Sequence, residues 1–406
     1  MTSGLQSQLG VLRRRITRID HKYRRDLVSP VRYQAETILP GREIENEQGR
    51  YFLSEKFFPH HRSHGSVELS RLAELPGSLL EGISGGELAP CDPRRWVFLD
   101  TETTGLSGGA GTCAFLVGVG TIEDSGFRVR LFFMRDFNEE PAMLAGLADF
   151  LAGYELLVTY NGKAYDAPLL ETRYRLARRP PPLHRLAHLD LLFAARRLWR
   201  LRLESCRLIA LENQILGVER EGDLPGEMIP YYYFEYLRTG QAFRLVPLFH
   251  HNVMDILSLA ALAAVILPAF GGHAGAGLRH GQDLLGLARW LAAHQNPEEA
   301  LDLYRRAVDR GLPDANLFAA LWETARIEKK LGRRDRAVAI WCDLAASKNP
   351  FRRHALQELA KYYEHAERNY PMALEMTTAA LRLEPLPDLE RRRLRLERKR
   401  AAPPLL

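Results

Sequence analysis

The sequence predicts an α/β domain built on a mixed sheet, followed by an all-helical repeat domain. Three observations support this prediction. Three short β-rich runs follow one another between residues 95 and 133, strands then alternate with helices up to residue 270, and the rest of the chain is helical and repeats itself. At 406 residues the chain also exceeds the usual size of one hydrophobic core, which agrees with two domains.

The first three strands are predicted to form a meander, because short turns separate them. They are expected at residues 95–100, 114–122 and 127–133. Strands and helices alternate after that point, which predicts a parallel second half of the sheet. The elements expected there are a helix at 139–153, a strand at 155–160, a helix at 166–177, a strand at 188–192 and a long apolar helix from Asp255.

The domain boundaries follow from changes in composition. Residues 1–32 hold eight Lys or Arg against two Asp or Glu, which is typical of a solvated or partly disordered arm. The glycines between residues 271 and 277 mark a linker. The predicted division is a basic arm at 1–50, the α/β domain with an N-terminal extension at 51–270, a linker at 271–279, helical repeats at 280–385 and a basic tail at 386–406.

The helical domain contains three related segments. Glu299–Ala307, Arg336–Leu344 and Met372–Ala380 are spaced by 37 and 36 residues, and a second helix precedes each of them. This pattern resembles tetratricopeptide repeats, although the usual Trp and Gly positions are mostly missing. The resemblance implies stacked helical hairpins and a surface for a protein partner.

Composition limits the cellular setting. The formal net charge of +6 favours polyanionic partners. The four cysteines form no pair with metal-ligand spacing and no disulfide framework, so a cytoplasmic location is expected. The apolar run Ile256–Phe270 is too short to span a bilayer and is predicted to be a buried core helix, so no membrane association is expected.

Acidic residues occur where these elements end or begin. Asp100 and Glu102 end the first strand, and side chains two apart on a strand face the same side. Such a pair alone is weak evidence, since acids often end strands as solvated turn residues. Asp166 follows the strand 155–160 and would suit a helix start in either a structural or a catalytic role. Asp255 lies in an apolar helix, where burial without a partner or a metal is unfavourable, and His251 precedes it by one turn.

Other features allow two interpretations. Ten arginines and two acids between residues 173 and 207 suit either a phosphate backbone or a solvated helix face. The aromatic run Tyr231–Tyr236 suits base stacking or core packing. Asp190 is interpreted as a structural acid, and His60, His61 and His64 as surface histidines because no acid or cysteine completes a ligand set.

Together, Phe98–Leu106, Tyr160–Asp166 and His251–Asp255 resemble the three exonuclease motifs of the DEDD superfamily, which has a ribonuclease-H-like fold. Two intervening segments, Gly108–Gly118 and Tyr233–Gly240, resemble its YprB-like branch. The resemblance covers about residues 51 to 270.

The resemblance implies hydrolysis of phosphodiester bonds with two Mg²⁺ or Mn²⁺ ions. Asp100, Glu102, Asp166 and Asp255 would be the metal ligands, and a histidine would be the general base. A five-residue spacing to Asp255 selects His250 and a four-residue spacing selects His251; His251 is favoured because His-Asn-x-x-Asp resembles the YprB-like branch.

The expected activity is therefore that of a 3′–5′ exonuclease on single-stranded DNA or RNA. Polarity and the requirement for an end come from the resemblance alone. Two alternatives stay open: a catalytically inactive scaffold that binds nucleic acid and recruits a protein through its repeats, and a structure-selective endonuclease. The sequence does not separate DNA from RNA, because that choice depends on contacts to the 2′-hydroxyl.

Overall fold

A computed structural model describes residues 35–105, 111–271, 275, 277–294 and 296–401. The residues outside these ranges are 1–34, 106–110, 272–274, 276, 295 and 402–406. They include most of the predicted basic arm and part of the predicted linker. The chain divides into two compact units, Met1–Arg196 with Glu204–His273, and Arg197–Leu203 with Ala274–Leu406.

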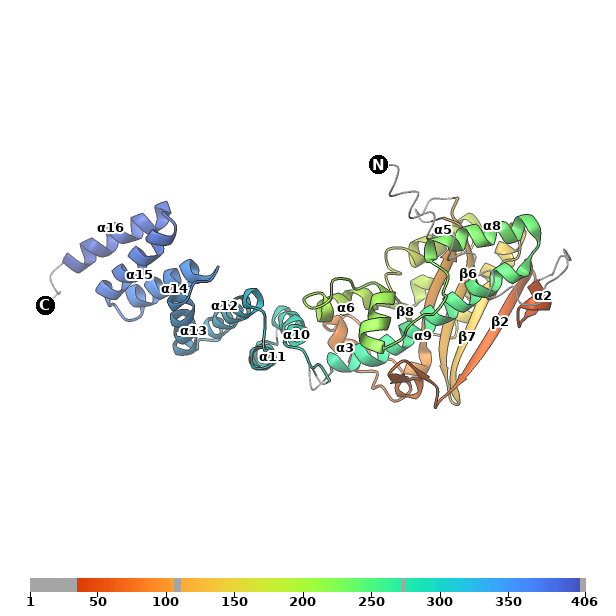
Figure 1. The fold of residues 1–406 in the computed structure, drawn as a ribbon, viewed down its shortest axis with the longest axis horizontal. Coiled ribbons are helices and arrows are strands. Elements are labelled where there is room, and N and C mark those ends of the chain that lie inside the picture. The colour runs from red at the N-terminus through yellow and green to blue at the C-terminus, as the bar shows by residue number, and fades with distance from the viewer. Residues whose placement is uncertain (1–34, 106–110, 272–274, 276, 295, 402–406) are drawn as a thin grey trace. The chain divides into compact units, whose positions relative to one another are not determined.

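The first unit contains a seven-stranded mixed sheet with the order β1-β2-β7-β6-β5-β8-β9 (Figure 1). Its strands are β1 (Arg42–Asn46), β2 (Gly49–Pro59), β5 (Trp96–Thr103), β6 (Ala114–Glu123), β7 (Gly126–Phe133), β8 (Leu156–Thr159) and β9 (Ala187–Asp190), and a small hairpin is formed by β3 (Ser63–His64) and β4 (Val67–Glu68).

The pairing confirms the predicted mixed sheet. Strands β5, β6 and β7 form an antiparallel meander, and β7 continues antiparallel to β2. Strands β5, β8 and β9 run parallel. Nine of the ten residues of β6 are buried, because this central strand is covered on both faces. The sheet begins at Arg42, before the boundary predicted at residue 51.

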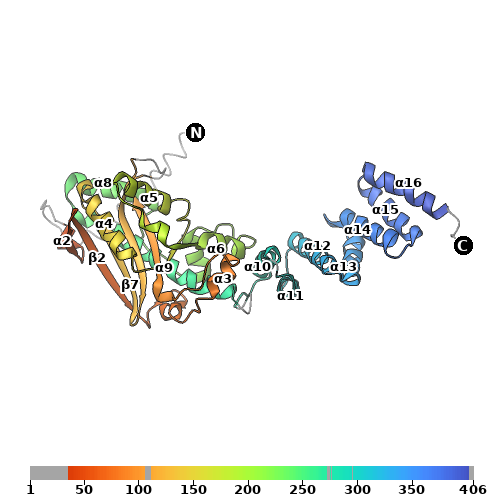
Figure 2. The ribbon, with the colours of Figure 1, turned by 180° about the vertical axis from the view of Figure 1, so that it is seen from behind.

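Helices cover both faces of this sheet. They are α2 (Ala35–Ile38), α3 (Leu79–Ser84), α4 (Glu140–Leu151), α5 (Asp166–Leu176), α6 (Leu191–Trp199), α7 (Leu208–Leu211), α8 (Ile229–Thr239) and α9 (Val246–Ala269). Figures 1 and 2 show α9 and α4 on opposite faces.

Helix α9 is the core helix that the sequence predicted. Residues Ala242–Ala269 are long and apolar enough to cross a membrane, but 72% of their most apolar window is buried inside the protein. The helix lies directly on the backbone of β6, because that strand has glycines where the two elements meet. A Cβ atom at Gly118 would overlap the Asn252 amide, and one at Gly120 would lie 2.5 Å from Ile256 Cγ2.

The hairpin β3–β4 packs against the same helix and corrects one prediction. His64 is buried, and its Nε2 lies 2.7 Å from the hydroxyl of Ser258 on α9. The prediction of a surface histidine is wrong for this residue, because the hairpin places its side chain under α9. His61 is exposed, as predicted.

The second unit consists mainly of helices that pair as consecutive hairpins, α10 with α11, α12 with α13 and α14 with α15. They are α10 (Gly281–Ala293), α11 (Pro297–Asp309), α12 (Asp314–Lys330), α13 (Arg334–Ala346), α14 (Arg352–His365), α15 (Tyr370–Leu383) and α16 (Pro387–Ala401). Ala288, Ala325 and Ala360, at corresponding positions of the three hairpins, are fully buried. Small residues at these positions let the paired helices approach closely.

The basic segment that begins at residue 386 is helical over α16. Three of its cations, Arg392, Arg395 and Lys399, bind the buried carboxylate of Glu364 on α14 at distances of 2.7 to 3.0 Å. These ion pairs lower the pKa of Glu364 to about 2, against the opposing effect of its burial. Helix α16 is thus held by charge as well as by the apolar contacts of Leu389 and Leu396.

We predict that Gly118→Ala destabilises the protein, because the added methyl group forces α9 away from β6. Overpacking of this kind typically lowers the free energy of unfolding by about 1–3 kcal/mol. Urea denaturation followed by circular dichroism measures the change. Gly226→Ala is the matched control, since a Cβ atom there meets nothing within 4 Å. Equal stability of the two variants would mean that α9 does not depend on the close approach at Gly118.

Candidate active site

The candidate site begins at the carboxyl end of β5. Asp100 and Glu102 point to one side of the strand, and the register with β6 shifts directly after Glu102. Glu102 is buried, and Asp100 is partly exposed. Thr101, between them, donates a hydrogen bond of 2.5 Å from its hydroxyl to Asp166 Oδ1. The end of β5 is therefore linked to the start of α5.

Asp166 is placed by a tight turn after β8. Asn161 has a φ of 67°, a left-handed conformation that asparagine tolerates better than most residues. The buried carboxylate of Asp190 accepts hydrogen bonds from the backbone N–H groups of Asn161 at 2.7 Å and Lys163 at 3.1 Å. Asp190 thus holds the turn that carries Asp166 to the amino end of α5, which agrees with the structural role predicted for it.

Helix α9 supplies the other side of the site. The amide of Asn252 donates a hydrogen bond of 2.8 Å to Asp100 Oδ2 and lies 3.5 Å from Glu102 Oε1. One ligand atom each of Glu102, His251 and Asp255 lie within 4.8 Å of one another. Residues about 150 positions apart therefore meet because α9 passes over the end of β5.

Two residues that sequence reasoning missed surround His251 and Asp255. Arg220 and Asp223 lie in the irregular segment before α8, where no periodicity or motif marks them. Asp223 Oδ2 lies 2.8 Å from His251 Nδ1, while His251 Nε2 lies 3.3 Å from Asp255 Oδ2. The Asp223 carboxylate therefore fixes the ring so that Nε2 faces the acidic residues.

Arg220 is a buried cation that contacts the acids around His251. Its guanidinium is only 5% exposed and pairs with Asp255, with Asp223 at 3.0 Å and with Glu212. Glu212 is fully buried, so an unpaired carboxylate there would be strongly destabilising. Arg220 balances charge on three acids from separate segments of the chain.

The acids of the site repel one another. Burial, followed by the charges of Asp255 and Asp166, raises the pKa of Asp100 well above its usual range. Burial is also the largest cause that raises the pKa of Glu102 to about 8, and that of Asp166 to about 6. Simultaneous ionisation of Asp100, Glu102 and Asp166 is therefore unfavourable in the chain by itself.

The histidine shows the opposite effect. Burial lowers the pKa of His251, but the carboxylates of Asp255 and Asp223 outweigh burial and raise it to about 9. The same contact, together with Arg220, lowers the pKa of Asp223 to about 2 although burial alone would raise it. In the chain by itself, His251 and Asp223 thus form a charged pair.

The donor set suits a hard divalent cation. It consists of carboxylate oxygens whose mutual repulsion a bound cation would relieve, and oxygen ligands are those that Mg²⁺ and Mn²⁺ prefer. Asp100, Glu102, Asp166 and Asp255 would hold such ions. The structure thus brings these four carboxylates into one neighbourhood.

The two candidate histidines have different surroundings. His251 belongs to the acidic group, whereas the adjacent His250 is exposed and is not part of the Glu102–His251–Asp255 group. Neighbouring residues on a helix point about 100° apart, which explains the difference. The geometry favours His251 as the residue that can exchange a proton in the site.

The arginine-rich segment has structural partners. Arg173 Nε lies 2.7 Å from Glu140 Oε1, and Arg202 Nε lies 2.8 Å from the buried carboxylate of Asp283. The aromatic run also divides: Tyr233 is buried and stacks on Phe115 with ring centroids 3.9 Å apart, whereas Tyr231 is 48% exposed. Ion pairs account for these two arginines, and core packing accounts for Tyr233.

A mixed sheet with acidic residues at the end of the first strand of its meander, faced by a helix that brings a further acid, defines a nuclease-type fold of the RNase H superfamily. The family model of the RNase_H superfamily matches residues 97–267, which include every predicted site residue.

The chain is 34% identical over 288 residues to the uncharacterized protein YprB of Bacillus subtilis (strain 168), a match that covers 70% of this chain and 68% of YprB. The chain belongs to the YprB-like family within the RNase H superfamily. The solved structure of a family B DNA polymerase from the hyperthermophilic archaeon Pyrobaculum calidifontis matches with a TM-score of 0.36 and 18% identity, covering 54% of this chain and 30% of the polymerase.

We predict that Glu102→Gln stabilises the metal-free protein at pH 8. A carboxyl group whose pKa is higher in the folded state binds its proton more tightly there, so the free energy of unfolding falls as the pH rises from about 4.5 to about 8. Glutamine removes this loss and keeps the shape of the side chain. Urea denaturation in EDTA at pH 5 and pH 8 should show a larger gain at pH 8.

Glu87→Gln, at an exposed position, is the control and should show no such pH-dependent gain. Mn²⁺ should raise the melting temperature of the wild-type protein more than that of Glu102→Gln, because binding to the folded state alone stabilises it. A Glu102→Gln variant that is less stable than the wild type at both pH values would show that repulsion does not dominate at this position.

Proposed function

We propose that this protein is a metal-dependent nuclease that hydrolyses phosphodiester bonds, acting as a 3′–5′ exonuclease on single-stranded DNA or RNA. The observation that carries the proposal is the shared neighbourhood of Asp100, Glu102, Asp166 and Asp255, with His251 among them. Membership of the RNase H superfamily supports the same reaction class. Two bound Mg²⁺ or Mn²⁺ ions would supply charge neutralisation at the reacting phosphate and activation of the attacking water.

The residues of the chain have distinct tasks in this proposal. The four carboxylates bind the ions, and Asn252 orients Asp100 through its 2.8 Å hydrogen bond. His251 accepts a proton at Nε2 while Asp223 holds Nδ1. Since carboxylates raise the pKa of His251 to about 9, neutralising them lowers that pKa toward the range of a base that works near neutral pH.

The setting proposed for this activity is the cytoplasm. The four cysteines are free. Nucleic acid is the proposed partner of the α/β domain, and a protein partner is proposed for the hairpins, whose relation to tetratricopeptide repeats rests on the spacing of 37 and 36 residues.

One assay separates the alternatives. Purified protein with Mn²⁺ is incubated with end-labelled single-stranded DNA, the matching RNA and a closed single-stranded circle. An exonuclease shortens the linear strands and leaves the circle intact. An endonuclease opens the circle. Binding without any cleavage would identify an inactive scaffold.

We predict that Asp100→Asn abolishes hydrolysis and leaves nucleic-acid binding largely unchanged. The substitution removes a charge that would bind metal, keeps the size of the side chain and leaves every Lys and Arg residue unchanged. Cleavage is measured on labelled oligonucleotides in Mn²⁺, and binding by fluorescence anisotropy. Undiminished Mn²⁺-dependent cleavage by this variant would indicate a contaminating nuclease or a different site.

The two histidines give a further prediction. His251→Ala should reduce the rate of cleavage by about a hundredfold or more, the range expected for loss of a general base. His250→Ala is the matched control, because the exposed neighbour lies outside the acidic group, and its rate should stay close to that of the wild type. The reverse ranking would transfer the role to His250.

A further inference from the structure

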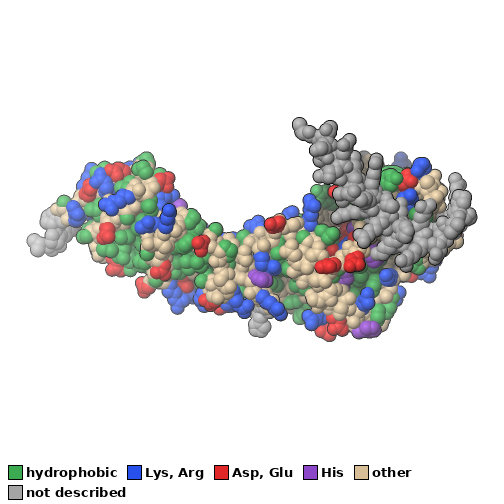
Figure 3. All heavy atoms as spheres, viewed as in Figure 1, with side chains coloured by type: hydrophobic (Ala, Val, Ile, Leu, Met, Phe, Trp, Pro, Cys, Tyr) green, Lys and Arg blue, Asp and Glu red, His purple; other side chains and the backbone are tan. Residues whose placement is uncertain are grey.

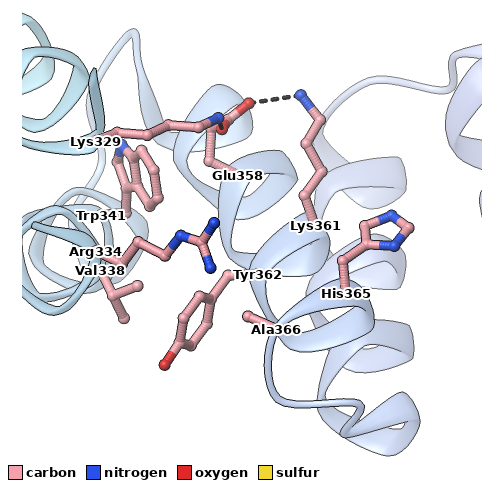
Figure 4. A pocket seen from close by; sticks show the side chains of 9 residues that line it. All are labelled: Lys329, Arg334, Val338, Trp341, Glu358, Lys361, Tyr362, His365 and Ala366. Carbon is pink, nitrogen blue, oxygen red and sulfur yellow. Dashed lines mark hydrogen bonds and ion pairs between the residues drawn. The ribbon is translucent and has the colours of Figure 1, made fainter. Parts of the chain in front are cut away.

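The helical unit contains a hollow of about 260 Å³ between α12, α13 and α14 (Figure 4). Its lining combines charged and aromatic side chains, chiefly Lys329, Arg334, Trp341, Glu358, Lys361 and Tyr362. None of these residues belongs to the candidate active site. The hollow therefore needs an explanation of its own.

The hollow has an excess of positive charge. Glu358 is the single acid of the lining, and both Lys329 and Lys361 place their Nζ atoms 2.5 Å from its carboxylate oxygens. Arg334 makes no ion pair with an acid among the residues that the structure describes, and Figure 4 shows its guanidinium reaching from α13 toward α14. Three cations thus face one carboxylate, and the surplus suits an anionic ligand.

Aromatic rings form the rest of the lining. Tyr362 is partly exposed, and its hydroxyl donates a hydrogen bond of 2.6 Å to Glu367, which fixes the ring. Trp341 is 3% exposed and forms the floor, with Lys329 Nζ 5.6 Å from its ring centroid. Cations next to a planar apolar surface are the combination that binds single-stranded nucleic acid, because phosphates pair with the cations and bases stack on the rings.

We propose that this hollow binds one nucleotide unit of single-stranded nucleic acid, with a phosphate at Arg334 and Lys361 and a base against Tyr362. The proposal rests on the proposed function, because a nuclease has nucleic acid as its substrate. Figure 3 shows Lys and Arg side chains, with Asp and Glu among them, beside hydrophobic side chains on one face of the helical unit. An acidic peptide would satisfy the same cations but would not provide a base for the Tyr362 ring.

The test uses the full-length chain carrying Asp100→Asn, so that binding is measured without cleavage. Affinity for a fluorescent single-stranded oligonucleotide is measured by anisotropy between 50 and 200 mM salt. We expect Arg334→Glu with Lys361→Glu to weaken binding and to reduce the salt slope by about 0.7, since loss of one phosphate contact to a single strand removes about 0.7. Arg334→Gln alone should weaken binding less, because Lys361 still contacts the phosphate.

Arg382→Glu is the matched control, because it reverses an exposed charge of the same unit outside the hollow, and it should keep the wild-type slope. Equal melting temperatures show that the variants are folded. An unchanged affinity and slope in the double variant overturns the proposal. Binding of a glutamate-rich peptide that is lost in the double variant, with nucleic-acid binding intact, overturns it in favour of a protein partner. These experiments measure binding and not cleavage. Absence of the proposed nuclease activity would therefore not be mistaken for failure of this binding site.

Discussion

Repulsion among closely spaced, largely buried carboxylates is the constraint on which the rest of the α/β domain depends. Asp100, Glu102, Asp166 and Asp255 lie close enough for their charges to act on one another, and burial removes the water that would screen them. A core of this kind folds only if other parts of the chain supply hydrogen-bond donors and positive charge. Thr101 on β5, Asn252 and His251 on α9, and Arg220 in the irregular segment before α8 are those donors.

The position of α9 meets this constraint. Its first half carries polar residues toward the end of β5, while its second half is apolar and buried. The glycines of β6 let the helix lie against the strand, so that a short amide side chain spans the distance to Asp100. Packing in the core and geometry in the site are thus set by the same contact, and a change in one necessarily affects the other.

Much of the fold was predictable because its signals are local. The meander at residues 95–133, the strand before Asn161 and the apolar helix around Asp255 each show the periodicity of their own secondary structure, and the structure contains all of them. Helix α9 begins at Val246, before the predicted start at Asp255. The acids of the site were found because they end or begin such elements. Arg220 and Asp223 were missed, since they lie in an irregular segment and become significant only when tertiary packing brings them to α9. The burial of His64 was also missed, because a strand of two residues is too short to show a periodicity in the sequence.

The outermost described strand, β1, also influences how the molecule behaves in solution. One side of this strand has backbone N–H and C=O groups that no neighbouring strand of the sheet pairs. Such an edge is a template for association with another chain unless its side chains prevent it. Arg42, Glu43 and Glu45 place charges of both signs along only five residues, which makes the edge short and costly to desolvate. These charges oppose the pairing of β1 with a strand of another molecule.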